Sequence, residues 1–266
     1  MDEYDFGFER EADPAQQEVE DLLRDLFSEE PQAVFYGRQI VVRFERQYFH
    51  WITNRALRNL AQEGEILVET KELWPGVPVK FYFSLKCRYW RRQSDARIKL
   101  IQGYSNESFG RALGHQGETM FDAALGGKGF RVLGKNVSEF GGRKWEATGE
   151  NLDRVYERDG LLYGSEIKNS LDYIPHEELN SKLEACKVLG LTPLFIVRMA
   201  PKTYMNDIIE AGGYGLLFGQ QLYPFGQDAF AAEVRAALDL PVGCPAAIPD
   251  GLVQRFETWH ERRGAA

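Results

Sequence analysis

The sequence has few cysteines and no long hydrophobic run, and each absence excludes a class of protein. Its three cysteines, Cys87, Cys186 and Cys244, are far apart and form no Cys-x-x-Cys pair, so disulfides and cysteine metal sites are not expected. No apolar run approaches the roughly 20 residues that cross a bilayer, and the acidic first residues are unlike the basic start of a signal peptide. We therefore expect a globular cytoplasmic protein with no membrane partner and, at 266 residues, one or two domains.

Acidic side chains outnumber basic ones over the whole chain, which has a net charge of -8, but not in every part of it. Residues 1–30 carry 12 acidic and 2 basic side chains, a net charge of -10, whereas residues 31–100 carry 13 basic and 6 acidic ones, a net charge of +7. A basic block of this kind suits a polyanion such as a nucleic acid. A solvated charged face is the alternative.

Three helical patterns follow an acidic tail at residues 1–12. Apolar side chains recur at three- and four-residue spacing over residues 14–31, and a second helical pattern covers residues 37–46. A third helix is expected to begin after Thr53, a good N-cap residue, and to end at Gly64. The sequence thus predicts three helices before the first strand.

Two β-rich runs, at residues 66–70 and 79–83, predict a hairpin with a long turn. Three helices followed by a hairpin is the order of a winged-helix nucleic-acid-binding domain, which we place at residues 13–85. The third helix would be the recognition helix and the hairpin the wing. The side chains expected to contact nucleic acid are Asn54, Arg55, Arg58, Asn59 and Gln62 on the helix and Lys71 and Lys80 on the wing. A module for protein–protein contact is the alternative.

A basic linker at residues 86–104 is expected to join the two halves of the chain. Its arginines are interleaved with Tyr89 and Trp90, a composition that suits contact with phosphates and stacking on exposed bases. The arginines assigned here to nucleic-acid binding are Arg88, Arg91 and Arg92. A connecting helix with solvated arginines is the alternative.

A second hairpin, at residues 151–169, is the most informative feature of the sequence. Asp159-Gly160 is a strong signal for a two-residue turn, and that turn pairs Asp153 with Glu166. Directly opposed residues have Cβ atoms about 5 Å apart, and like charges so placed are destabilising unless something neutralises them. A divalent cation is the expected partner of the two carboxylates.

The returning strand completes a recognisable motif. Because side chains alternate along a strand, Lys168 lies on the same face as Glu166, and Ile167 points into the core. The set Asp153 and Glu166-Ile167-Lys168 resembles the PD-(D/E)XK nuclease superfamily, whose pattern is an acidic residue on one strand and Glu-x-Lys on the next. Leu152 stands where the superfamily's pattern has proline, which is a departure that many members share.

The resemblance implies a restriction-endonuclease-like αβββαβ core, of the α/β class, at residues 105–225. Members similar to archaeal junction resolvases and restriction endonucleases also carry a glutamate on the preceding helix, a position that Glu118 matches on the helix expected over residues 105–125. Residues 226–266 are expected to form a helical appendage that serves packing or a homodimer contact. Polar residues on the helix after the motif suit either phosphate contact or a solvated helix face; they are Asn180, Lys182 and Lys187.

The resemblance also implies a cofactor and a reaction. Mg²⁺ would be held by Asp153, Glu166 and the Ile167 carbonyl, with Glu118 contacting it through water or a second ion, and Mn²⁺ is the alternative ion. The ion would activate a water molecule and stabilise charge on the scissile phosphate, and Lys168 would orient or deprotonate that water. The expected function is a Mg²⁺-dependent endonuclease that hydrolyses DNA, of a restriction, repair or recombination type. A DNA-binding regulator with a non-catalytic nuclease fold and an RNA-directed nuclease are the alternatives.

Overall fold

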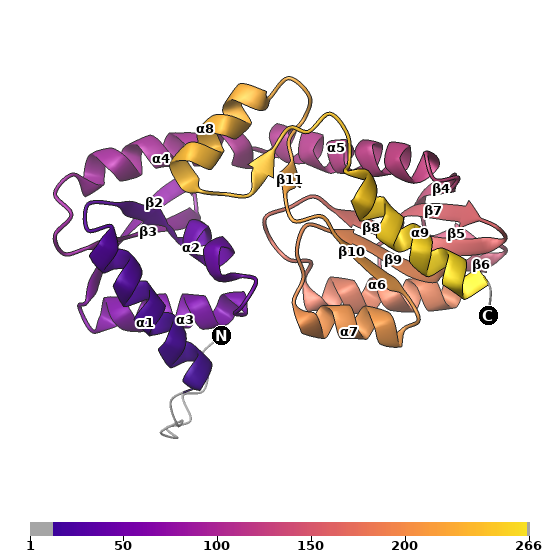
Figure 1. Cartoon of the computed structure of the whole chain (residues 1–266), viewed down its shortest axis with the longest axis horizontal. Coiled ribbons are helices and arrows are strands. Elements are labelled where there is room, and N and C mark those ends of the chain that lie inside the picture. The colour runs from indigo at the N-terminus through magenta and orange to yellow at the C-terminus, as the bar shows by residue number, and fades with distance from the viewer. Residues whose placement is uncertain (1–12, 265–266) are drawn as a thin grey trace. The chain divides into compact units, whose positions relative to one another are not determined.

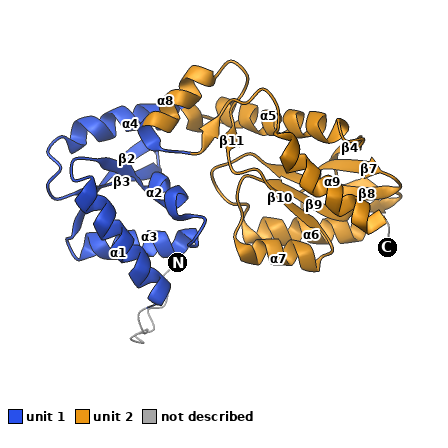
Figure 2. Ribbon diagram, viewed as in Figure 1, with its two compact units in different colours: residues 1–103, 237–240 blue, residues 104–236, 241–266 orange. Residues whose placement is uncertain are grey.

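The computed structural model describes residues 13–264, so the acidic tail expected at residues 1–12 lies outside the described part. The chain divides into two compact units (Figure 2). Unit 1 comprises residues 1–103 and 237–240, and unit 2 comprises residues 104–236 and 241–266. No helix within residues 13–264 is long and apolar enough to cross a membrane.

Unit 1 combines helices with a small antiparallel sheet (Figure 1). Its elements are α1 (Pro14–Glu29), β1 (Val34–Tyr36), α2 (Gly37–Phe44), α3 (His50–Gln62), β2 (Ile66–Trp74), β3 (Val77–Ser84) and α4 (Trp90–Ser105). The strands are ordered β1-β3-β2. Leu23, Ile40 and Leu57 are fully buried, one from each of the first three helices, and belong to one hydrophobic cluster. The apolar spacing that predicted the helices is therefore the spacing of their buried faces.

Three local expectations for unit 1 are wrong. Strand β1 was not expected, because three residues are too few to show an alternating pattern. Thr53 is not an N-cap but lies fully buried inside α3, which begins at His50 because Ile52 also packs against the core. The turn of the first hairpin is short, since Trp74 pairs with Val77 across Pro75-Gly76. Gly76 has φ 77°, a conformation that glycine adopts readily.

Unit 2 is built on a five-stranded mixed sheet ordered β10-β9-β8-β7-β4. Strands β4, β7 and β8 are antiparallel neighbours, and β9 and β10 continue the sheet in parallel with β8. The elements that build the sheet and its main helices are α5 (Glu107–Gly126), β4 (Arg131–Val137), β7 (Leu152–Arg158), β8 (Leu161–Lys168), α6 (His176–Leu189), β9 (Thr192–Val197), α7 (Lys202–Glu210), β10 (Tyr214–Leu217) and α9 (Asp250–Gly264). Smaller elements are β5 (Glu139–Phe140), β6 (Arg143–Lys144), β11 (Gln221–Leu222), α8 (Asp228–Leu238) and β12 (Val242–Gly243). The chain is thus of the mixed α/β class, as expected.

The sheet of unit 2 is covered on both faces (Figure 1). Tyr156 packs with Phe121 of α5 and Phe256 of α9, whereas its neighbour Val155 packs with Cys186 of α6. Successive side chains of a strand point to opposite faces. Asp153 therefore shares the α6 face with Val155.

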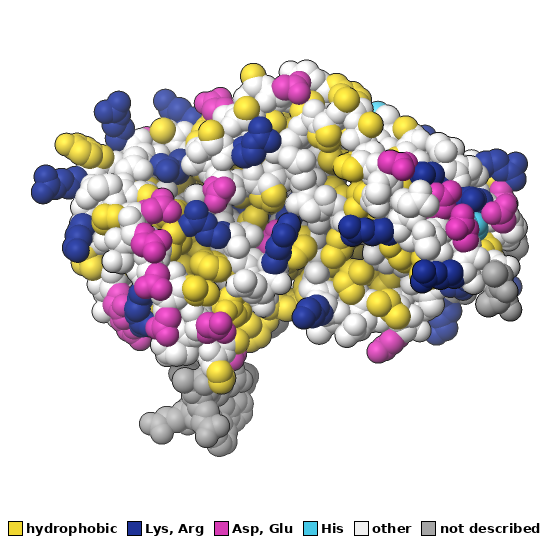
Figure 3. Space-filling model, viewed as in Figure 1, with side chains coloured by type: hydrophobic (Ala, Val, Ile, Leu, Met, Phe, Trp, Pro, Cys, Tyr) yellow, Lys and Arg dark blue, Asp and Glu magenta, His cyan; other side chains and the backbone are white. Residues whose placement is uncertain are grey.

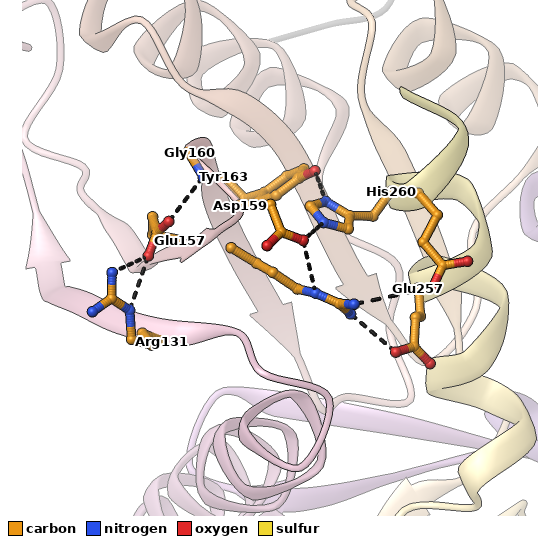
Figure 4. A network of polar contacts seen from close by, with 9 residues as sticks. Arg131, Glu157, Asp159, Gly160, Tyr163, Glu257 and His260 are labelled. Carbon is orange, nitrogen blue, oxygen red and sulfur yellow. Dashed lines mark hydrogen bonds and ion pairs between the residues drawn. The ribbon is translucent and has the colours of Figure 1, made fainter. Parts of the chain in front are cut away.

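The turn of the β7–β8 hairpin is fixed by helix α9 (Figure 4). Asp159 and Gly160 both have positive φ, 52° and 77°, as a two-residue hairpin turn requires. The buried ring of His260 lies between the Tyr163 hydroxyl, 2.7 Å from Nδ1, and the Asp159 carboxylate, 3.1 Å from Nε2. The turn expected from Asp-Gly is confirmed, and its side-chain contacts help to hold the register in which β7 meets β8.

Candidate active site

Asp153 and Glu166 lie at the end of the β7–β8 pairing. The last register partners of the two strands are Arg154 and Ser165, and Asp153 and Glu166 come next in the chain on either side of this end of the ladder. Asp153 Oδ2 accepts a hydrogen bond of 2.7 Å from the backbone N–H of Ile167. Glu166 is only 5 % exposed. The hairpin therefore brings two carboxylates together beneath α6.

Burial makes both carboxylates reluctant to ionise, and the charge of Asp153 adds to this effect at Glu166. Burial raises the pKa of Asp153; the Ile167 N–H opposes this rise, and the charge of Glu118 adds to it. Burial, and then the charge of Asp153, raise the pKa of Glu166 to about 7, even though Lys182 opposes the rise. Burial is therefore the larger part of this electrostatic cost, and repulsion between neighbouring carboxylates adds to it.

Lys182 of α6 is the cation in contact with this pair. Its Nζ lies 2.8 Å from Glu166 Oε2, it donates to the Asn151 carbonyl, and its side chain is 7 % exposed. Burial lowers the pKa of Lys182, but the charges of Glu166 and Asp153 raise it more, so the amine stays protonated. The solvated helix face that was one expectation for Lys182 is wrong, because the side chain is buried.

The spacing of apolar residues in the sequence indicates that Lys182 is buried. The residue stands three positions after Leu179 and seven before Leu189, and both leucines are buried on the inner face of α6. The spacing places Lys182 on that same face. A lysine at a core position needs a partner of opposite charge, and this signal points to a carboxylate on the sheet below.

Lys168, the lysine of the motif, lies on the expected face but is held by a different residue. Its Nζ donates to both carboxylate oxygens of Glu178 on α6, at 2.9 and 3.1 Å, and its side chain is 32 % exposed. Glu178 was not singled out from the sequence. Its charge also contributes to the raised pKa of Glu166, so it belongs to the same cluster.

Glu118 of α5 reaches the site through Arg154. Its Oε2 accepts from Arg154 Nη2 at 2.6 Å, while Arg154 Nε lies 3.1 Å from each oxygen of Asp122. Arg154 Nη1 also donates to the Asp153 carbonyl at 2.8 Å. One buried arginine thus links the helix glutamate to the backbone of Asp153. Asp122 and Arg154 were not expected here, because the contact depends on how α5 packs on β7.

Asn169 joins the end of β8 to its neighbours. Its buried amide Nδ2 donates to the carbonyls of Leu113 on α5 and Leu222 on β11, at 2.8 and 2.7 Å. Its Oδ1 accepts from the Leu222 N–H at 2.8 Å. These contacts hold the end of β8, which carries Glu166 and Lys168, against α5, which carries Glu118.

The residues fit a magnesium ion held by two carboxylates. Within residues 13–264 no three histidine, cysteine, aspartate or glutamate side chains gather as a metal-binding group, and Glu118 is paired with Arg154. Mg²⁺ is commonly bound by one or two carboxylates plus water and substrate phosphate. Glu166 supplies a buried carboxylate and Asp153 a half-buried one, and when both are ionised the one charge of Lys182 does not balance them. This surplus of negative charge suits a divalent cation.

The residues expected to contact nucleic acid on α3 separate into two groups. Asn54, Arg58 and Gln62 are exposed. Arg55 donates to Gln16 of α1 at 3.3 Å and lies over the Trp51 ring, and Asn59 donates to Glu20 of α1 at 3.0 Å. Acidic side chains gather over the region of α1 (Figure 3). The exposed group is therefore better placed for contact with a polyanion.

The remaining basic residues of unit 1 differ in the same way. Lys80 is exposed, whereas Lys71 pairs with Asp95 of α4 and with Glu69. The three expected arginines of the linker are all exposed; they are Arg88, Arg91 and Arg92. Beside them Tyr89 is 69 % exposed and lines a shallow pocket of about 370 Å³ together with Arg92. This surface offers an aromatic face and positive charge together.

Comparison of the chain with protein-family models, curated proteins and solved structures finds no match. The function of the chain is therefore inferred from its residues and their contacts, above all from the carboxylate pair on the hairpin.

Proposed function

We propose that the chain is a Mg²⁺-dependent nuclease that hydrolyses DNA phosphodiester bonds, with a PD-(D/E)XK site at Asp153, Glu166 and Lys168. The observation that carries this proposal is a pair of neighbouring carboxylates, Glu166 buried and Asp153 half-buried, with Lys168 on the same face of the sheet. Burying like charges is costly, and a fold that served only as a scaffold would gain nothing from it. A site that binds a divalent cation gains from both charges.

The architecture of unit 1 supports a winged-helix domain as the DNA-binding part. Its elements run α1-β1-α2-α3-β2-β3 with the strand order β1-β3-β2, so that a hairpin follows the third helix. On this proposal α3 enters the major groove with Asn54, Arg58 and Gln62, and the hairpin contacts the backbone through Lys80. The core of unit 2, α5-β4-β7-β8-α6-β9, supports the restriction-endonuclease-like fold in the same way.

Each residue of the site has a defined role on this proposal. Asp153, Glu166 and the Ile167 carbonyl would hold the ion, and Glu118 would contact it through water. When bound, Mg²⁺ supplies a Lewis acid that stabilises negative charge on the phosphate undergoing attack. Lys168 orients the attacking water, and Glu178 positions that lysine by accepting two hydrogen bonds from its amine.

The test is cleavage of linear, circular, single-stranded, methylated and branched DNA with and without Mg²⁺. Asp153→Ala, Glu166→Ala and Lys168→Ala should abolish cleavage and keep DNA affinity, because these side chains serve the ion and the water. Glu118→Ala should be milder, since an outer-sphere contact is less demanding. Glu146→Ala, which alters an exposed carboxylate of unit 2, is the matched control and should cleave normally.

The outcomes separate the competing functions. Cleavage at the wild-type rate by any of the three site variants would exclude the proposed site. DNA binding without cleavage of any substrate would indicate a regulator with a non-catalytic fold. Preferential cleavage of RNA in a parallel assay would identify an RNA-directed nuclease.

A further inference from the structure

Lys182 is the buried lysine of the described chain, and both of its polar contacts lie at the carboxylate pair. Its Nζ is 2.8 Å from Glu166 Oε2 and also donates to the carbonyl of Asn151, two residues before Asp153. A buried ammonium is costly unless a charged partner compensates it. The fold therefore maintains a positive charge at this point.

The other cations of the site are engaged elsewhere. Lys168 is bound by Glu178 through both carboxylate oxygens. Arg154 pairs with Glu118 and Asp122, and it meets Asp153 through the backbone carbonyl. Among the described residues, Lys182 is thus the basic side chain that forms an ion pair with Glu166.

We propose that Lys182 is the resident counter-ion of the metal-free site and that a divalent cation must displace its ammonium group from Glu166 to bind. The inference rests on the proposed metal site. Ionised Asp153 and Glu166 carry two negative charges, which a divalent ion balances by itself. At the carboxylate pair itself, the ion and Lys182 together would carry one positive charge more than Asp153 and Glu166, and the two cations would compete for Glu166 Oε2.

Displacement would also give Lys182 a second task. An ammonium released from Glu166 remains on α6 beside the ion, where an anionic phosphate of the substrate can accept its hydrogen bonds. Metal binding would then convert a stabilising lysine into a substrate-binding one. Lys182 would be a positioning residue in the metal-free protein and a phosphate contact in the loaded one.

The affinity test is calorimetric titration of the full chain with Mg²⁺ and with Mn²⁺ in the absence of DNA. Lys182→Met and Lys182→Gln should bind the ion about tenfold more tightly than wild type, a change of about 1.4 kcal/mol. Lys168→Met removes a nearby charge that is not in contact with the pair, so its effect should be smaller. Lys187→Met, on the exposed side of α6, is the remote control and should bind like wild type. Lys182→Gln keeps an N–H donor and carries the test if the methionine variant does not fold.

A measurement on the unaltered chain distinguishes displacement from simple repulsion between charges. Acylation of Lys182 by a small amine-reactive reagent, mapped by mass spectrometry, should rise when Mg²⁺ is added, while acylation of Lys187 stays constant. Unchanged labelling of Lys182 in metal-bound protein, or unchanged affinity in its variants, overturns the inference and leaves the metal site intact. Absence of metal binding by every protein, wild type included, removes the proposed site and the inference together.

Discussion

Gly117 of α5 lies directly against Asn169, the residue that follows Lys168: a Cβ added to Gly117 would lie 2.8 Å from the Cβ of Asn169. Asn169 is held by three hydrogen bonds and has little freedom to move. Gly117→Ala should therefore push α5, with Glu118, away from the end of β8. The expected loss is about 1–3 kcal/mol of unfolding free energy, the usual cost of overpacking, measured by urea denaturation.

Gly114, three residues earlier on the same helix, is the control for this prediction. No described atom outside the helix backbone lies within 4 Å of a Cβ built there. Gly114→Ala should stabilise the protein by about 0.5–1 kcal/mol, because alanine favours the helix. Equal effects of the two substitutions would show that the contact with Asn169 does not set the position of α5.

The features predictable from the sequence are those determined locally. The register of β7 with β8 follows from Asp159-Gly160, since a two-residue turn with positive φ at both positions leaves one pairing. The start of α3 was misplaced at Thr53 because burial of Ile52 extends the helix, and burial depends on the rest of the unit. Local preference is a weak guide where packing decides.

The ionic partners of the site belong to the part that local patterns do not specify. Lys182 contacts Glu166 only if α6 packs on the sheet at the position along β8 where Glu166 lies. That of Arg154 with Glu118 requires α5 to pack on the opposite face of β7. Both are contacts between elements distant in sequence, and only the three-dimensional packing determines which charges meet.

Exposed and engaged residues of α3 should contribute unequally to DNA binding. In full-length Asp153→Asn, used to prevent cleavage, Arg58→Ala should weaken duplex binding and reduce the slope of log K against log salt by about 1, as loss of one phosphate contact does. Arg55→Ala should have less effect, because Arg55 is engaged by Gln16 and Trp51. Lys144→Ala in unit 2 is the control. A larger effect at Arg55 would contradict the assignment of the binding face.

Glu166 should make the metal-free protein less stable as the pH rises. The pKa of Glu166 is about 7 in the folded chain, against an ordinary value of 4.5. At a pH between these two values, the folded state therefore keeps a proton on Glu166 that the unfolded state has lost. The stability is fully present below the lower value and is lost as the pH passes the higher one, by about 3 kcal/mol for this shift. Glu166→Gln cannot titrate and should lack this decline.

The measurement is chemical denaturation of both proteins in chelator at about pH 5 and about pH 8. The stability of Glu166→Gln relative to wild type should rise between the two. An equal pH response would show that Glu166 ionises normally in the folded protein. Glu146→Gln, at an exposed carboxylate, should follow wild type.

Asp153→Asn should reverse its effect on stability when metal is added. The asparagine amide oxygen can still accept the Ile167 N–H, so the substitution removes the charge and keeps the hydrogen bond. In chelator near pH 8 the variant should be at least as stable as wild type, by a few tenths to about 1 kcal/mol on the cross-strand scale. With Mg²⁺ at about 100 times the dissociation constant, wild type gains about 2.7 kcal/mol that the variant lacks.

Thermal melting with chelator and with millimolar Mg²⁺ measures the difference in stability between the two proteins under both conditions. If metal shifts both proteins equally and the variant is clearly weaker in chelator, the carboxylates do not share an ion, and their burial serves the pairing with Lys182 alone.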